Sequence, residues 1–332
     1  MSSMPLPPGS LSTTRPSWRA RAAYSVGVRA IGPLTRRYLS EDGKVPIADR
    51  MVTVGKAVER LSRAQRRRPF VRRLQITRDT VDGVTVETVR APGCTASLAE
   101  GALLYFHGGG FFLGNLDSHL QTVAILAERT GLPVVHVDYR QHPAVRVDGS
   151  VQDCVTAYRW LLERGATPQR VIFGGDSAGG FLAFATAQAV RQQGLDGPAG
   201  VVGISPLLDI DCVTRSEHEN AWRDPVIWAA ALPPIMACAR PDEGIADPSP
   251  VHGDLEDFPP SLIVVAESEA LRCDAERMHD ALVAAGRPCA LRVWPRQLHA
   301  FPAVFPFLPE SKAAFDAIAR FIQERIAAAD DR

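Results

Sequence analysis

Six short apolar segments between residues 102 and 294 alternate with stretches of helical periodicity, and this alternation constrains the fold more than any other feature. Short apolar runs without interleaved polar side chains are typical of strands that are buried on both faces of a sheet. Alternation of such strands with helices predicts βαβ units, and hence an α/β fold with a mainly parallel central sheet flanked by helices. The expected strands are 102–106, 134–138, 171–173, 199–205, 261–265 and 290–294, and the expected helices are Leu120–Thr130, Val151–Arg164, Gly180–Gln193 and Cys273–Ala285.

The chain that precedes this region has a different character. Its first dozen or so residues are rich in Pro and Ser and are expected to form a disordered tail. From about Tyr24 to Arg68, apolar residues recur at intervals of three and four, which predicts helices. Two β-like runs then flank Val81-Asp82-Gly83, and this pattern predicts a hairpin with Asp-Gly at the turn.

A long insertion, from about residue 207 to residue 260, separates two of the expected strands. It contains the stretch "CVTRSEHENAWRDPVIWAAALPPIMACARPDEG". Connections in compact domains are usually much shorter, and longer ones commonly cover a functional site. We therefore expect residues 207–260 to cover part of the protein.

Composition and cysteine pattern limit the cellular location and the metal and disulfide chemistry that we expect for the chain. Apolar residues make up 46% of it, yet no uninterrupted apolar run approaches the roughly 20 residues that span a bilayer. The N-terminus lacks the apolar segment of a signal peptide, so we expect a cytoplasmic protein without stable membrane insertion. The six cysteines form no C-x-x-C pair and the histidines no H-E-x-x-H motif, so we expect free thiols and no metal site.

The net charge of zero conceals a basic N-terminal region. Residues 1–73 contain 16 Lys and Arg against 4 Asp and Glu. A block of this kind can attract an anionic substrate, a membrane surface or an acidic partner protein. Basic helices that are simply solvated, or paired with the acidic remainder of the chain, explain the same pattern, and we favour this second interpretation.

The segment "VIFGGDSAGGF" places Ser177 in a G-x-S-x-G motif, between an expected strand and an expected helix. In that context a tight strand-to-helix turn projects the serine hydroxyl, and the glycines permit the strained backbone. A serine hydroxyl needs a base to take its proton and a third group to orient that base. A glycine-rich strand–helix turn could instead bind phosphate, so the motif by itself leaves both interpretations open.

A second glycine-rich loop favours the interpretation of Ser177 as a nucleophile. His107-Gly108-Gly109-Gly110 follows directly after the expected strand 102–106. Consecutive glycines allow backbone N–H groups to point into a cavity, where they can stabilise the oxyanion of an acyl-transfer reaction. We expect the N–H groups of Gly108, Gly109 and Ala178 to form this oxyanion hole, with His107 supporting the loop.

At these motifs the sequence resembles the hormone-sensitive-lipase-like family of α/β-hydrolases. The resemblance runs from about residue 95 to the C-terminus through "YFHGGGFFLGNLDSH", "VVHVDYR", "GGDSAGG", "ISPLLD", "FPPSLIVVAESEAL" and "LRVWPRQLHAF". It implies an α/β-hydrolase fold and a Ser–acid–His esterase. It also implies a helical cap, so we divide the chain into an N-terminal tail and cap helices, 1–68, and a catalytic domain, 69–332, whose insertion at 207–260 can add to the cap.

The base and the acid are expected after the last two strands. His299 follows "ALRVWPRQL", in the loop where the family has its histidine, and Ser…acid…His is the chain order of this fold. Many relatives have Asp-Pro-Leu-Arg after the preceding strand, and aligning "EALR" with that pattern places Glu269 at the acid position. Asp274 is the alternative, although it lies a turn into the following helix. Either carboxylate can orient an imidazole.

The sequence thus predicts a cofactor-free serine carboxylesterase that acts on short- to medium-chain or small-molecule esters. Phe111, Phe112, Trp222 and Trp228 are candidates to line its pocket, and packing in the core or cap is the alternative for them. An amidase, a lactonase or an acyltransferase of secondary metabolism, and a non-catalytic small-molecule receptor on the same fold, are the competing functions. We expect no nucleic-acid partner. A homodimer and an acidic carrier protein docked on the basic region are the macromolecular partners that we considered.

Overall fold

The computed structural model describes residues 15–39, 45–242 and 247–329. The tail that we predicted for the first dozen or so residues lies outside this part of the chain. All six cysteine thiols are free. Among the described residues, no helix combines the length and the apolar character needed to cross a bilayer.

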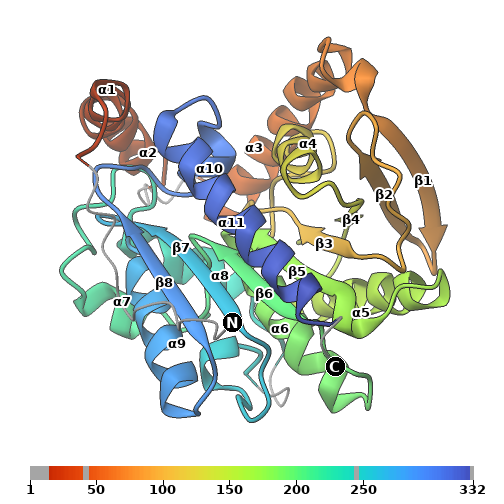
Figure 1. Cartoon of the computed structure of the whole chain (residues 1–332). Coiled ribbons are helices and arrows are strands. Elements are labelled where there is room, and N and C mark those ends of the chain that lie inside the picture. The colour runs from red at the N-terminus through yellow and green to blue at the C-terminus, as the bar shows by residue number, and fades with distance from the viewer. Residues whose placement is uncertain (1–14, 40–44, 243–246, 330–332) are drawn as a thin grey trace.

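A mainly parallel sheet of eight strands, in the order β1-β2-β4-β3-β5-β6-β7-β8, forms the centre of the molecule (Figure 1). The pairs β1–β2 and β2–β4 are antiparallel, and the other five pairs are parallel. The six strands predicted from apolar runs are all present, so the α/β interpretation is confirmed. The strands are β1 Gln75–Val81, β2 Val84–Arg90, β3 Ala102–Phe106, β4 Val134–Asp138, β5 Val171–Asp176, β6 Gly200–Ile204, β7 Ser261–Ala266 and β8 Cys289–Trp294.

The predicted hairpin is the β1–β2 pair, and its turn has the expected residues. Val81 pairs with Val84, so Asp82 and Gly83 alone form the loop. Both have positive φ, 47° and 83° respectively. A two-residue loop with positive φ at both positions matches the twist of the strands, and Asp-Gly adopts it readily.

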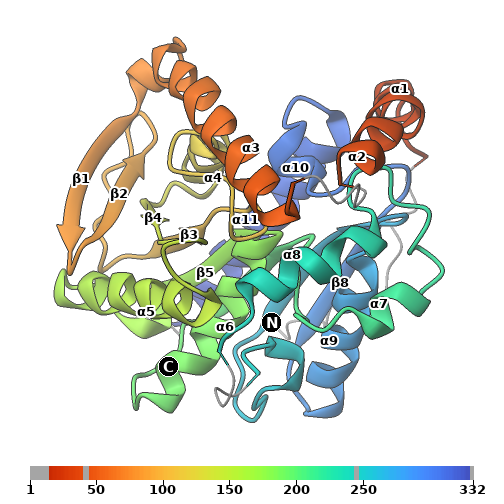
Figure 2. The same cartoon turned by 180° about the vertical axis from the view of Figure 1, so that it is seen from behind.

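Helices cover both faces of the sheet and bury its apolar side chains. Helices α4 and α11 pack on one face, where α11 crosses in front of the strands in Figure 1. Helices α5, α6 and α9 pack on the other, and α5 and α6 lie in front in Figure 2. Helix α11 was not predicted. The bounds are α4 Leu120–Thr130, α5 Val147–Glu163, α6 Ala178–Gln192, α9 Arg272–Ala284, α10 Phe301–Val304 and α11 Pro309–Ala327.

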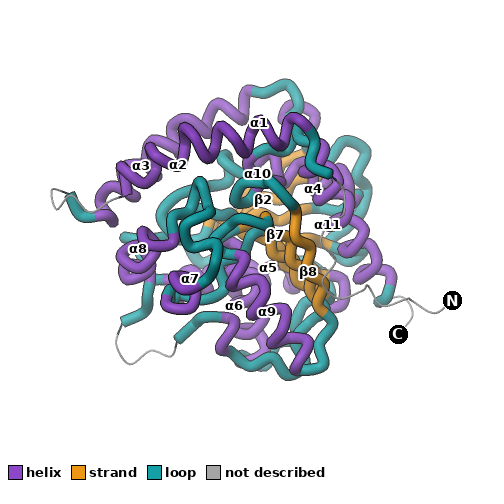
Figure 3. The backbone as a smooth tube through the Cα atoms, turned by 90° about the vertical axis from the view of Figure 1, so that its left-hand side faces the viewer, coloured by secondary structure: helices purple, strands orange, loops and turns teal. Residues whose placement is uncertain are grey.

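Two segments far apart in sequence contribute helices beside the loops that follow the strands. The N-terminal helices α1, α2 and α3 lie on one side of the molecule (Figure 3), and α3 packs against α8 of the 207–260 insertion. The division of the chain at residue 68 stays a prediction. The helices are α1 Trp18–Val26, a π-helical turn Gly27–Ile31, α2 Gly32–Leu39, α3 Ile47–Ser62, α7 Val213–Glu217 and α8 Leu232–Ala239.

Candidate active site

Ser177 occupies the sharp turn between β5 and α6, with a strained backbone at φ 53° and ψ −119°. The two glycines of the motif are required by close approach. A Cβ on Gly175 would lie 2.2 Å from the carbonyl oxygen of Gly179, and a Cβ on Gly179 would lie 2.0 Å from that of Phe106. Only hydrogen fits at both places, so the G-x-S-x-G pattern is a packing requirement of a turn that presents the serine.

His299 and Glu269 meet across the loops that follow β8 and β7. His299 Nδ1 lies 3.0 Å from Glu269 Oε2, and both side chains are buried. The second carboxylate oxygen of Glu269 accepts a hydrogen bond of 3.1 Å from the N–H of Ala266. A carboxylate on Nδ1 favours the tautomer with its proton there, which leaves Nε2 as the ring nitrogen able to accept a proton.

Burial and neighbouring charge act in opposite directions on this pair. Burial lowers the pKa of His299, but the hydrogen bond and charge of Glu269, with the charge of Asp224, outweigh it and raise the pKa above its ordinary value of 6.5. Burial raises the pKa of the Glu269 carboxyl, and the contact with His299 only partly offsets this effect. The imidazole is therefore stabilised in its charged form, as a base that must carry a proton during a reaction requires.

Asp224 is a second buried carboxylate beside this pair, and the sequence analysis did not single it out. Its Oδ1 accepts hydrogen bonds from the N–H groups of Val226 and Ile227, and its Oδ2 accepts one from that of Ala270, at 2.7–2.9 Å. Asp224 therefore joins the 207–260 insertion to the turn that carries Glu269. The Asp-Pro pair within "RDPV" was the only sequence signal, and it indicates a turn rather than a role.

Two further polar side chains hold the loops of the site together. The Ser205 hydroxyl, after β6, accepts a hydrogen bond of 3.0 Å from the N–H of Ala300, next to His299. The Asn220 amide donates to the carbonyl oxygens of Glu267 and Glu269, at 2.8 and 3.1 Å. Neither residue was predicted, because each acts through the backbone of a distant segment.

The alternative acid, Asp274, faces away from His299 in the first turn of α9. Its carboxylate accepts hydrogen bonds from the fully buried Arg215, the shortest being 2.6 Å from Nη2. It also accepts hydrogen bonds from the N–H groups of Leu208 and Asp209, at 2.8 and 3.1 Å. The structure thus brings Glu269, and not Asp274, to the histidine.

The glycine-rich loop after β3 differs from our expectation at one position. The N–H of Gly108 donates to Asp176 Oδ1 at 3.2 Å, so a protein acceptor already uses this donor. For Gly109, Gly110 and Ala178, by contrast, no backbone acceptor faces the N–H group. A Cβ on Gly110 would meet open space. The Gly108 N–H is therefore bonded within the protein, contrary to our expectation of a free oxyanion donor, whereas the N–H groups of Gly109, Gly110 and Ala178 remain available.

Asp176, the residue before Ser177, anchors this loop. Its Oδ1 also accepts a hydrogen bond from the Tyr105 hydroxyl at 2.7 Å, and its Oδ2 lies 3.3 Å from His119 Nε2. His107 stacks on Tyr139, whose hydroxyl donates to the His107 carbonyl oxygen at 2.6 Å. Burial lowers the pKa of His107 to about 3, so this histidine is neutral and supports the loop.

The four aromatic pocket candidates occupy different environments. Phe111 is buried against Phe181 of α6, with ring centroids 5.5 Å apart, which is the core-packing alternative. Trp222 is 67% exposed, and its place in a pocket lining stays a prediction. Trp228 packs beside Trp222, at 6.3 Å between ring centroids, and its indole N–H is buried without a partner.

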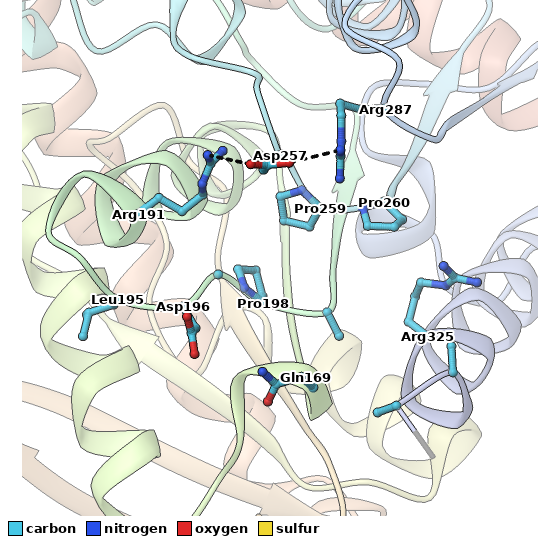
Figure 4. A pocket seen from close by; sticks show the side chains of 14 residues that line it. Gln169, Arg191, Leu195, Asp196, Pro198, Asp257, Pro259, Pro260, Arg287 and Arg325 are labelled. Atoms are coloured by element: carbon cyan, nitrogen blue, oxygen red, sulfur yellow. Dashed lines mark hydrogen bonds and ion pairs between the residues drawn. The ribbon is translucent and has the colours of Figure 1, made fainter. Parts of the chain in front are cut away.

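Phe112 lines a cavity whose lining includes neither Ser177 nor His299, so its place in the substrate pocket stays a prediction. This cavity has a volume of about 480 Å³ and lies between α3 and the glycine-rich loop. A second cavity, of about 410 Å³, lies at the opposite ends of the strands from Ser177 (Figure 4). Pro198, Pro259 and Pro260, which precede β6 and β7, form part of its wall, so it is separate from the candidate active site.

One group of potential metal ligands is present among the described residues. Oxygen and nitrogen atoms of Asp209, Asp247 and His252 lie within 4.8 Å of one another. The guanidinium of Arg277 contacts both Asp209 and His252. The guanidinium of Arg277 already neutralises negative charge in this group. The group therefore does not alter the chemistry of the candidate active site.

Comparison with known proteins identifies the family. A family model described as alpha/beta hydrolase fold matches residues 103–303. The crystal structure of an esterase from the bacterial hormone-sensitive lipase family superposes with a TM-score of 0.74 and 32% identity, covering 85% of this chain and 99% of that one. The chain belongs to the hormone-sensitive-lipase-like family of α/β-hydrolases. As a member of this family it is a carboxylesterase.

Other relatives agree with this assignment. An acetyl-hydrolase of Streptomyces hygroscopicus is 36% identical over 71% of this chain and 82% of its own length. The carboxylesterase/phospholipase LipF of Mycobacterium tuberculosis is also 36% identical, over 73% of this chain and 67% of its own. The crystal structure of EstE5 soaked with p-nitrophenyl butyrate has a TM-score of 0.78 and 31% identity, covering 91% of this chain and 99% of that one.

Proposed function

We propose that this carboxylesterase hydrolyses short- to medium-chain or other small-molecule esters through Ser177, His299 and Glu269. The observation that carries the proposal is the contact of 3.0 Å between His299 Nδ1 and Glu269 Oε2. It supplies the oriented base that a serine nucleophile needs. The strained turn at Ser177 supplies the nucleophile in the position that this fold uses.

In the proposed reaction, His299 Nε2 takes the hydroxyl proton while Ser177 Oγ attacks the acyl carbonyl carbon. Glu269 holds the ring and stabilises its positive charge without itself taking the proton. His299 then protonates the departing alcohol as the acyl-enzyme forms. In the second half, His299 takes a proton from water, whose oxygen attacks the acyl-enzyme, and it returns this proton to Ser177.

The oxyanion of each tetrahedral intermediate is assigned to the N–H groups of Gly109, Gly110 and Ala178. Support comes from the free donors of the glycine-rich loop and from the position of Ala178 at the first turn of α6. The first N–H groups of a helix have no partner within the helix, and the helix dipole favours negative charge there. Fixed donors of this kind are usually the largest single contribution to acyl transfer.

The proposed substrate range is supported by what the relatives are named for. The Streptomyces relative is an acetyl-hydrolase, and EstE5 was soaked with a butyrate ester. The test is a panel of p-nitrophenyl esters from acetate to laurate, measured with wild type and with Ser177→Ala. We expect turnover of the shorter esters by the wild type, and a fall in kcat of about 10⁶-fold in the variant.

The matched control is Ser216→Ala, which removes the hydroxyl of an exposed serine in α7. This variant should keep wild-type turnover. The proposal fails if the wild type turns over no ester of the panel, or if Ser177→Ala keeps a rate close to that of the wild type.

A further inference from the structure

The outer face of residues 15–39 combines exposed apolar side chains with exposed arginines. A helix on a protein surface ordinarily turns its large apolar residues inward and its polar residues outward. Here the side chains that face outward include large apolar and aromatic ones, and two of them, Trp18 and Leu34, are each 68% exposed. The exposed apolar set is Trp18, Val26, Val28, Ile31, Leu34 and Tyr38.

The inner face of the same helices explains why large apolar side chains are exposed, because small residues form most of that inner face. A Cβ on Gly27 would lie 2.6 Å from Leu298 Cδ2, and a Cβ on Gly32 would lie 3.0 Å from the carbonyl oxygen of Pro225. Ala20 is buried as well. The helices therefore approach the body of the protein through small residues, and the large apolar side chains are left outside.

The position of these helices is defined by contacts on both sides. At the start of α1, the Ser17 N–H and hydroxyl both donate to the carboxylate of Glu310, at 2.6 and 3.1 Å. In α2, Arg36 Nη2 donates to the carbonyl oxygen of Trp222 at 3.2 Å. Trp222 is itself 67% exposed, so it extends the apolar set across to the 207–260 insertion.

The charge of this face has one sign. Residues 15–39 contain six arginines and no Asp or Glu. All six arginines (Arg15, Arg19, Arg21, Arg29, Arg36 and Arg37) are exposed. Single exposed apolar residues are normal on a soluble protein, but here six large ones are exposed within one segment of 25 residues, beside six exposed arginines.

We propose that the outer face of residues 15–39, together with Trp222, is a docking surface for an anionic phospholipid bilayer. Segments that lie in the plane of a membrane interface combine exposed Lys and Arg with exposed Trp, Phe and Leu. The arginines attract anionic headgroups, while the apolar side chains enter the boundary between headgroups and acyl chains. The protein binds at the surface of this bilayer, and no segment of it crosses the membrane.

Docking in this way would place the candidate active site against the membrane. Gly27, on the inner side of the docking surface, packs on Leu298, which directly precedes His299. The docking surface is therefore next to the loop that carries His299. Binding itself does not depend on the proposed ester hydrolysis, so the two proposals can fail separately.

The test is sedimentation with unilamellar vesicles of phosphatidylcholine alone, and of phosphatidylcholine and phosphatidylglycerol in equal parts. We expect wild type to bind the anionic vesicles and to bind neutral ones far more weakly. Arg21→Gln with Arg29→Gln should weaken anionic binding roughly fivefold per arginine and flatten its dependence on salt. Trp18→Gln with Leu34→Gln should weaken binding at least about tenfold at every salt concentration.

The matched control pairs Val283→Gln in α9 with Arg159→Gln in α5, on the opposite side of the molecule from α1 (Figure 1). It should bind anionic vesicles as the wild type does. Every variant should keep wild-type turnover of p-nitrophenyl acetate, which shows that it is folded. The proposal is overturned if wild type does not sediment with anionic vesicles, or if the control loses binding as the surface variants do. Binding that depends on the arginines but not on Trp18 and Leu34 also overturns it, because the apolar side chains would then not enter the bilayer.

Discussion

Glu269 and Asp274 lie five positions apart in one short segment, and both carboxylates are buried. They differ in the groups that surround them. Glu269, in the turn after β7, faces His299, a partner that can gain or lose a proton. Asp274, in α9, faces Arg215, a permanent cation, and two backbone N–H groups. The partner of each carboxylate therefore decides the role of that carboxylate. A carboxylate beside a titratable base can serve catalysis, whereas one paired with a buried guanidinium holds segments together.

The largest effect expected within this comparison comes from Glu269→Gln. The variant keeps the shape of the side chain but removes the charge that orients and stabilises the imidazolium. We expect kcat on p-nitrophenyl acetate to fall by about 10⁴-fold. Asp274→Asn, assayed in parallel, is the matched control and should retain most of the wild-type kcat. If instead Asp274→Asn lost the activity and Glu269→Gln kept it, the two roles would be exchanged.

Asp274→Asn should act on stability. It leaves the guanidinium of Arg215 charged and buried without its counter-ion, and removing one partner of a buried pair costs about 3–5 kcal/mol of unfolding free energy. Urea denaturation followed by fluorescence measures this loss. The double variant Arg215→Met with Asp274→Leu, which removes both charges, should recover much of it. A single variant as stable as the wild type would contradict the structural role of the pair.

The smallest effect is a displacement of the pH profile. In the proposed mechanism His299 must be unprotonated to act as the base, so kcat/KM should fall as the pH drops through the pKa of His299, which lies above 6.5. Without the charge of Glu269, burial acts with less opposition and the pKa of His299 moves down. The acid limb of the residual activity of Glu269→Gln should therefore lie at lower pH than that of the wild type. An unchanged acid limb, measured as kcat/KM against pH, would show that Glu269 does not set this pKa.

Much of the fold could be predicted because its signals are local. Apolar runs such as 102–106 and 134–138 become strands with the same bounds in the structure. Asp82-Gly83 forms the predicted hairpin turn because its φ angles suit those two residues. Helix α11 was not predicted from the sequence. The short helices of the 207–260 insertion have too few turns to show a period.

The candidate site was predictable where chain order and backbone chemistry suffice. Ser177 was placed by two glycines whose hydrogens alone fit the turn, and His299 by its position after the last strand. Asp224 could not be found in this way, because the contact that joins it to the turn of Glu269 is with the N–H of Ala270, 46 residues away. The exposure of Trp222 also depends on where the insertion lies, which its own sequence does not reveal.

By itself, the sequence determined the α/β architecture, the strand-to-helix turn at Ser177 and the glycine-rich loop before it. Periodicity and steric limits at glycine act within a few residues, so they can be read along the chain. Only the tertiary structure decided that Glu269 rather than Asp274 faces His299, that Asp176 takes the N–H of Gly108, and that Trp18 and Leu34 lie outside. Each of these outcomes is a competition among partners from distant segments, and it is settled by which groups are buried together.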